Sequence, residues 1–223
     1  MGSFVKSFDT PGINISRGEF FSLCHAHSGM KTVLTLLTML ACLTLAPAAR
    51  AQAVLDHKSA VALLDSGAYI LLMRHTQTEA GTGDPPHFKL GDCSTQRNLN
   101  TEGREQARAW GRWFQQHQIR LSEIRSSAWC RCEETARLAF ANSGARITLW
   151  PALNSFFDTP ARRELQTAQV LQELASYRGQ HSLMLVTHQV NITALTGVVP
   201  AMGEIVVTRY SGGRLLVLGR IAL

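Results

Sequence analysis

The 223-residue sequence lacks low-complexity tracts and internal repeats, and only 7% of its residues are aromatic. The absence of biased or periodic segments excludes a disordered or fibrous chain, because such chains are built from them. Hydrophobic residues make up 45% of the sequence, which is enough for one buried core. The length favours a single domain, so the composition indicates an ordinary globular protein.

Dense runs of positive charge are also missing, although the formal net charge is +6. The arginines are scattered through expected helices, where such residues are typical of a solvated surface. The basic balance favours an anionic partner, such as a phosphorylated small molecule. Nucleic acid is not favoured, because basic and aromatic residues do not interleave as they do in nucleic-acid-binding modules. We therefore expect a small phosphorylated substrate and no nucleic-acid partner.

The apolar stretch Val33–Leu45 is too short to cross a bilayer comfortably. Lys31 precedes it, and Ala49 and Ala51 follow it with the Ala-x-Ala spacing of a signal-peptide cleavage site. A buried core helix is the alternative, but it leaves the cleavage pattern unexplained. We therefore predict that residues 30–51 are a signal peptide and that the mature protein is periplasmic or secreted, with no stable membrane span after cleavage.

The expected signal peptide starts at Met30, well inside the sequence. Residues 1–29 show no sustained periodicity, and we interpret them as a non-native extension upstream of the true start codon. Residues 52–223 are then the one functional domain of the chain. No pattern in the sequence indicates its oligomeric state.

Cysteine is sparse after the expected cleavage point, where only Cys93, Cys130 and Cys132 remain. A zinc site needs more ligands, at closer spacing, than these three cysteines and His87 offer. An oxidising compartment instead favours one disulfide and one odd thiol. Because Cys130 and Cys132 cannot easily bond within one helical turn, we expect Cys93 to pair with one of them, and either pairing is open.

Apolar periodicity divides the domain into alternating helices and strands. Continuous apolar runs predict two strands that are buried on both faces, at residues 69–73 and 182–186. The other expected elements are helices at 54–66, from 101, at 128–142, at 162–177 and from 190, short strands at 122–126 and 147–150, and a terminal hairpin of 205–209 with 215–220. This alternation predicts an α/β fold, a three-layer α/β/α sandwich with a mainly parallel central sheet.

Local signals add detail to this outline. Thr101 and Ser127 are the expected N-caps of the helices that follow them. Residues 76–100 are rich in Gly, Pro, Asp and Thr and predict a long loop. Loops of this length inside a compact domain are usually functional, so we expect this loop to take part in a site.

Both strongly apolar strands are followed directly by a histidine. The first run delivers Arg74-His75-Thr76, and the second delivers Thr187-His188. Ligands bind beyond the carboxyl ends of the strands in open α/β sheets. One histidine at such a place is often an ordinary polar residue, but two at equivalent places indicate a site.

The order of these residues resembles the motif pattern of the histidine phosphatase superfamily (phosphoglycerate-mutase-like, branch 1). Residues 72–76 (LMRHT) resemble its first motif, residues 127–136 (SAWCRCEETA) its second and residues 185–188 (LVTH) its third. Residues 100–107 (NTEGREQA) are similar to the family's helix after the loop. The likeness extends from about residue 69 to 197, and within the family the chain resembles small exported members such as the lipopolysaccharide core heptose phosphatases.

The resemblance implies a phosphatase that hydrolyses phosphate monoesters with no metal or other cofactor. His75 would be the nucleophile that takes the phosphoryl group as a phosphohistidine. Arg74, Arg131 and His188 would bind the phosphoryl group, whose charge is spread over its oxygens. The further substrate-binding residues that we expect are Thr76, Asn154 and Thr187.

The sequence departs from the family pattern at two positions. Thr76 stands where Gly is frequent, and Asn154 lies in the region where many relatives place a Glu or Asp acid. Because Asn cannot protonate a leaving group, Glu79 and Asp158 become the candidates for proton donor, with Asp84 as a third. The alternative function is a catalytically inactive, phosphatase-like module that binds a phosphorylated envelope ligand.

Overall fold

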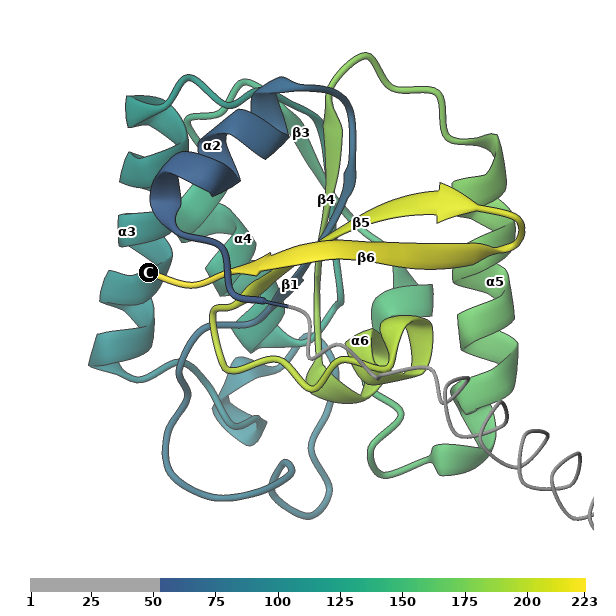
Figure 1. Ribbon diagram of the computed structural model, residues 1–223. Helices are drawn as coiled ribbons and strands as arrows, with labels where there is room; N and C mark the ends of the chain where they lie inside the picture. The colour runs from purple at the N-terminus through teal and green to yellow at the C-terminus, as the bar shows by residue number, and fades with distance from the viewer. Residues whose placement is uncertain (1–52) are drawn as a thin grey trace, which may run out of the picture. The chain divides into compact units, whose positions relative to one another are not determined.

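A computed structural model describes residues 53–223 of the chain (Figure 1). The expected upstream extension, residues 1–29, and the expected signal peptide, residues 30–51, lie outside the described residues. Within the part that is described, no helix is both long and apolar enough to span a membrane.

Six strands form one sheet in the order β3-β2-β4-β1-β5-β6. The strands are β1 (Ile70–Arg74), β2 (Leu121–Ser126), β3 (Arg146–Leu149), β4 (Ser182–Thr187), β5 (Ile205–Ser211) and β6 (Arg214–Ile221). The first four strands in this order are parallel to one another, whereas β5 and β6 are antiparallel additions at one edge. Gly212 and Gly213 join β5 to β6 with positive φ angles, as a tight hairpin requires. The predicted, mainly parallel sheet is confirmed.

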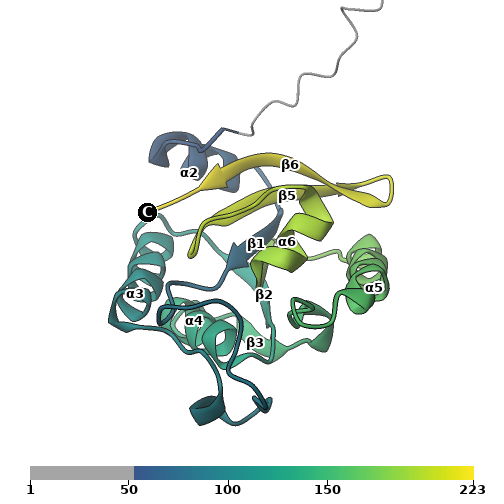
Figure 2. The same ribbon diagram turned by 90° about the horizontal axis from the view of Figure 1, so that it is seen from below.

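Helices cover both faces of this sheet (Figure 2). They are α2 (His57–Asp65), α3 (Thr101–Gln116), α4 (Cys130–Phe140), α5 (Arg163–Ser176) and α6 (Gln189–Thr196). Side chains of α2, α3 and α4 form one buried cluster with the sheet, and side chains of α5 and α6 form a second cluster on the opposite face. The three-layer α/β/α architecture is therefore also confirmed.

The central strand β1 explains why its sequence is apolar at successive positions. Leu71 and Met73 belong to the first cluster, whereas Ile70 and Leu72 belong to the second. Side chains alternate between the faces of a strand, so a strand covered on both faces needs apolar residues on both.

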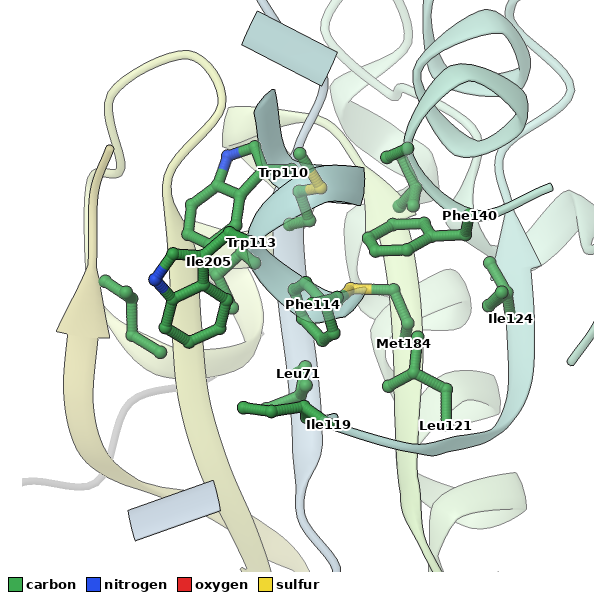
Figure 3. Packing of buried hydrophobic residues seen from close by; sticks show 14 of the residues in the cluster. Leu71, Trp110, Trp113, Phe114, Ile119, Leu121, Ile124, Phe140, Met184 and Ile205 are labelled. Atoms are coloured by element: carbon green, nitrogen blue, oxygen red, sulfur yellow. The ribbon is translucent and has the colours of Figure 1, made fainter. Parts of the chain in front are cut away.

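The apolar side of α3 packs as its spacing predicts. Ala107, Trp110 and Phe114 are all buried, and Trp110 is fully so. Figure 3 shows Trp110 and Phe114 against the sheet residues Leu71 and Ile205. The indole Nε1 of Trp110 donates a hydrogen bond to the carbonyl oxygen of Gly203, so the polar group of this buried ring is satisfied (2.7 Å).

Both predicted N-caps are wrong, each for a local reason. Helix α3 begins at Thr101, but its cap is Asn100, whose side-chain oxygen accepts a hydrogen bond from the Gly103 amide. Helix α4 begins at Cys130 and is not capped by Ser127. The hydroxyl of Ser127 is instead hydrogen-bonded to His188, because the chain leaves β2 extended before it turns into the helix.

The loop that follows β1 has little hydrophobic anchoring. Between Met73 and Leu99, a stretch that the structure describes throughout, no hydrophobic side chain is buried. The loop holds one short 3-10 helix, Cys93–Thr95, and a disulfide joins Cys93 to Cys130 at the start of α4. The expected pairing of Cys93 with a cysteine of this helix is confirmed, and Cys132 is a buried free thiol.

Candidate active site

The register of the sheet brings the two predicted histidines together. Strands β1 and β4 are parallel neighbours in which Arg74 pairs with Thr187, and both strands end there. His75 and His188 are the next residues of their chains, and their ring centroids lie 5.5 Å apart. The site therefore stands at the carboxyl edge of the sheet, where the two apolar runs end.

His75 is held as one neutral tautomer. Its Nδ1 lies 2.9 Å from the carbonyl oxygen of Thr76, and because that oxygen only accepts hydrogen bonds, Nδ1 carries the proton. The Nε2 lone pair is then free. Burial, reinforced by the positive charge of Arg131, lowers the pKa of His75 to about 3, so the ring is neutral at ordinary pH.

His188 contacts both the second motif and the helix that carries it. Its Nε2 lies 2.8 Å from the hydroxyl oxygen of Ser127, and its Nδ1 lies 3.4 Å from a guanidinium nitrogen of Arg131. Burial and the charge of Arg131 lower the pKa of His188 well below its usual value. The neighbouring Cys132 thiol lies 3.4 Å from Nε2, and burial raises the pKa of this thiol to about 12. Cys132 is thus a neutral packing group beside the site.

Three arginines converge on the histidines. Arg74 precedes His75, Arg131 lies in the first turn of α4, and Arg97 comes from the loop after β1. Within the described residues, the Nε–H groups of all three are buried and have no hydrogen-bond acceptor. Buried polar groups are normally paired, so these three donors indicate a place for an anion.

Two of these arginines are held from behind by the protein. Arg74 donates a hydrogen bond to the carbonyl oxygen of Pro200 (2.8 Å). Arg131 forms a buried ion pair with Asp84, with its NH1 2.8 Å from the carboxylate. Each guanidinium is therefore oriented by a contact outside the space between the histidines, which leaves its other edge for a ligand.

The histidines and arginines line a pocket of about 250 Å³. Asp84 and Asp158 are the carboxylic acids among its lining residues. Its lining is partly apolar, with contributions from Phe157, Val190 and Met202, and the exposed Phe157 lies at its rim. The lining thus combines positively charged side chains with apolar ones.

Comparison with known proteins agrees with this geometry. The sequence pattern of the histidine phosphatase superfamily (branch 1) matches residues 70–157, which include the first two motifs and the loop between them. Over this segment the chain is similar to the histidine phosphatase superfamily. No curated protein sequence matches the chain.

Solved structures share the fold of this chain. The alpha-ribazole phosphatase from Shigella flexneri is 17% identical, with a TM-score of 0.50, and the match covers 68% of this chain and 96% of that one. YhfR from Bacillus stearothermophilus is 15% identical with the same TM-score, and the match covers 68% and 96% of the two chains. At such identities the likeness concerns the fold alone. The resemblance to heptose phosphatases stays a prediction.

The superfamily's third motif lies beyond the matched segment, and here the structure supplies the link. His188 reaches the pocket because β4 is the direct neighbour of β1. The predicted residues His75, Arg74, Arg131 and His188 therefore line one pocket. Their catalytic roles stay predictions.

The two candidate proton donors lie in different places. Asp158 is exposed and lines the pocket. Glu79 lies outside this lining, in an adjoining hollow that it shares with Arg104. Asp84 lines both hollows, but its carboxylate is occupied by Arg131. The position of Asp158 is the more favourable one for a proton donor.

The three predicted substrate-binding residues use their side chains within the protein. The hydroxyl of Thr76 lies 3.1 Å from that of Thr135, and the hydroxyl of Thr187 donates to the carbonyl oxygen of Leu153. The side-chain oxygen of Asn154 accepts hydrogen bonds from the amide of residue 128 and the hydroxyl of residue 127. These contacts fix the backbone around the pocket, and binding to substrate stays a prediction for all three.

Two site residues are not indicated by the motif analysis as part of the anion site. Arg97 stands in the loop, four residues before the start of α3, and Asp84 pairs with a residue 47 positions later. Arg97 is held there because its NH1 donates to the hydroxyl of Thr78 and to the carbonyl oxygen of Gly81. A loop rich in Gly and Pro but containing one Arg is the signal that marks this residue.

Proposed function

We propose that this chain is a phosphatase that hydrolyses small phosphate monoesters through a phosphohistidine on His75, without a metal ion. The match of residues 70–157 to the histidine phosphatase superfamily supports phosphatase activity. The observation that carries the proposal is the state of His75, whose ring is neutral and whose Nε2 lone pair is free inside a pocket that three guanidinium groups line.

The proposed reaction has two displacements at phosphorus. First, Nε2 of His75 forms a bond to phosphorus while the bond from phosphorus to the ester oxygen breaks, and the alcohol leaves with a proton. Then a water oxygen bonds to phosphorus, the bond from phosphorus to nitrogen breaks, and inorganic phosphate leaves. Dividing one displacement into two is the usual gain of covalent catalysis.

The arginines supply the charge that this chemistry needs. The transferring group spreads its negative charge over the equatorial oxygens, and fixed cations stabilise that charge in the transition state. Arg74, Arg97 and Arg131 carry buried donors that have no protein acceptor among the described residues. His188 becomes a fourth donor once a bound anion offsets the burial that keeps its ring neutral.

Asp158 is the proposed proton donor to the leaving oxygen. It lines the pocket beside the apolar rim, and its exposure allows it to exchange protons with water. The volume of about 250 Å³ fits a phosphoryl group with a small leaving group. Phe157 is half-exposed at the rim, where it can contact that leaving group.

Among the described residues, no group of three or more His, Cys, Asp or Glu side chains is placed to hold a metal ion. We therefore propose that catalysis is metal-independent. Export through the signal peptide at residues 30–51 is part of the same proposal. The Cys93–Cys130 disulfide supports it, because disulfides persist in oxidising compartments.

The test is hydrolysis of an aryl phosphate by the purified chain, with and without EDTA, beside His75→Ala. His57→Ala is the matched control, because His57 is exposed on α2 and outside the pocket. We expect the wild type to turn over substrate in EDTA. His75→Ala should lose this activity, and His57→Ala should keep it. Rapid acid-free quenching should trap one phosphoryl group per chain, labile to acid. Phosphate or vanadate binding without turnover would instead favour the inactive binding module.

Amino-terminal sequencing of the protein purified from the envelope fraction tests the export proposal. A mature chain that begins at residue 52 supports it, and a retained residue 1–29 segment contradicts it. Asp158→Asn separates the proton donor from the nucleophile. It should slow hydrolysis of alkyl phosphates far more than that of nitrophenyl phosphate, whose leaving group needs no proton.

A further inference from the structure

Asp84 is a buried carboxylate whose two oxygens are both occupied. Its Oδ1 accepts hydrogen bonds from the Arg131 guanidinium (2.8 Å) and the Arg97 amide (3.0 Å). Its Oδ2 accepts one from the indole Nε1 of Trp129 (3.0 Å). The side chain is only 2% exposed, so these three donors replace water around it.

The same contacts keep Asp84 ionised. Burial by itself raises the pKa of this carboxyl, but the hydrogen bond and charge of Arg131, with the donors on Arg97 and Trp129, lower it overall. A carboxylate in this state has no proton to give. Asp84 is therefore not suited to protonate the leaving group, although it lines the pocket.

We propose that Asp84 is a positioning residue, which aims the Arg131 guanidinium at the phosphoryl group and keeps it there. This inference rests on the proposed function. Asp84 takes NH1 of Arg131, which leaves NH2 facing His188 at 3.4 Å and the buried Nε without an acceptor among the described residues. The edge that remains free is the one beside the histidines.

Electrostatics show why Arg131 needs such a partner. Arg74 and Arg97 line the same pocket and form no ion pair with any described residue. Three like charges in one partly buried pocket repel one another more strongly than they would in water. The Asp84 carboxylate, paired with Arg131, offsets part of this repulsion, so the guanidiniums stay together before an anion arrives.

Asp84 also connects two parts of the loop after β1 with the start of α4. It stands in the loop after β1 and accepts hydrogen bonds from the Arg97 amide, near the end of that loop, and from the Trp129 indole, just before α4. The loop buries no hydrophobic side chain of its own. Together with the Cys93–Cys130 disulfide, this carboxylate fixes the relative placement of Arg97 and Arg131.

The experiment compares Asp84→Asn, which keeps the size and removes the charge, with Asp92→Asn as the matched control. Asp92 belongs to the same loop and caps its 3-10 helix, but it is exposed and outside the pocket. For each full-length variant, kcat and KM for an aryl phosphate, affinity for inorganic phosphate by calorimetry, and the unfolding temperature are measured.

At temperatures where the variant is folded, Asp84→Asn should lower kcat/KM and phosphate affinity by roughly 10- to 100-fold. A misplaced group of this kind has effects of that size. Asp92→Asn should stay within twofold of the wild type. In an Arg131→Lys background the Asp84→Asn loss should shrink to less than about threefold, because a lysine has no second guanidinium edge to aim.

Two results would overturn the role of Asp84. One is wild-type phosphate affinity in folded Asp84→Asn, and the other is an equal loss in the Arg131 and Lys backgrounds. The readouts also separate the two proposals. A wild type that binds phosphate without turnover, with binding weakened by Asp84→Asn, would contradict the proposed hydrolysis and support the positioning role of Asp84. Turnover that Asp84→Asn leaves intact would do the reverse.

Discussion

Acid should destabilise this protein through His75, and replacing that residue should remove the effect. His75 is 3% exposed, and its pKa in the folded protein is about 3, against an ordinary value of 6.5. Asn is the matched replacement, because its side-chain amide can still donate to the carbonyl oxygen of Thr76 in place of Nδ1. The change therefore removes the titrating ring and keeps its hydrogen bond.

The sign follows from where the proton binds. The folded pKa lies below the unfolded one, so between pH 6.5 and about 3 the unfolded chain takes up a proton that folded His75 does not. Stability then falls as the pH falls through this window. At pH 4 the gap from 6.5 is roughly 2.5 pH units, and at 1.36 kcal/mol each this removes about 3 kcal/mol from the free energy of unfolding.

Urea unfolding from pH 7 to pH 4, in buffers free of phosphate, measures this free energy for the wild type and His75→Asn. Phosphate must be left out because an anion in the pocket would raise the pKa of His75. As the pH falls, the free energy of unfolding of His75→Asn should rise by about 3 kcal/mol relative to that of the wild type. The carboxylates titrate in both proteins and cancel, whereas His188 is coupled to His75, which lowers its pKa, so His188 contributes to the difference as well. A difference that stays constant within about 0.5 kcal/mol would refute a buried, neutral His75.

Three further changes test the framework of the site. Cys93→Ser opens the loop of 37 residues that Cys130 closes, and should lower the free energy of unfolding by about 4 kcal/mol in urea; an unchanged midpoint under oxidising conditions would contradict the pairing. Gly103→Ala would place a Cβ 1.9 Å from the carbonyl oxygen of Gln77. It should lower stability by roughly 1–3 kcal/mol and also slow turnover, since that backbone follows His75, the proposed nucleophile; a fully active, stable variant would show that the contact is absent. Trp110→Ala should lower the unfolding free energy by roughly 3–5 kcal/mol, with calorimetry as the check and a loss under 1 kcal/mol as the contrary result.

Much of the fold can be predicted from the sequence because it rests on periodic patterns. Strand β1 lies in the middle of the sheet, so both of its faces are apolar and its run of apolar residues is unambiguous. The meeting of His75 and His188 follows from two such strands that end in register. The helix caps failed because Asn and Ser choose between local and distant partners, and the sequence does not show the distant ones.

The rest of the candidate site depends on contacts without a local pattern. The pairing of Asp84 with Arg131 spans 47 residues and lies in a loop that buries no hydrophobic side chain. Neither spacing nor periodicity marks such a contact before the fold is known. Arg97 has only a weak signal, as the one arginine of the loop, and it is placed at the site by hydrogen bonds from its guanidinium to the loop.

The neighbours of β1 have a consequence for how the protein is made. Both strands that pair with β1, namely β4 and β5, come late in the chain, and the contact between Tyr69 and Ser182 joins residues 113 positions apart. During synthesis, the apolar segment Ile70–Arg74 must therefore wait without a strand partner until more than 100 further residues have emerged. We expect this segment to be the one that chaperones bind on the nascent chain, and no partly made chain to carry out phosphoryl transfer.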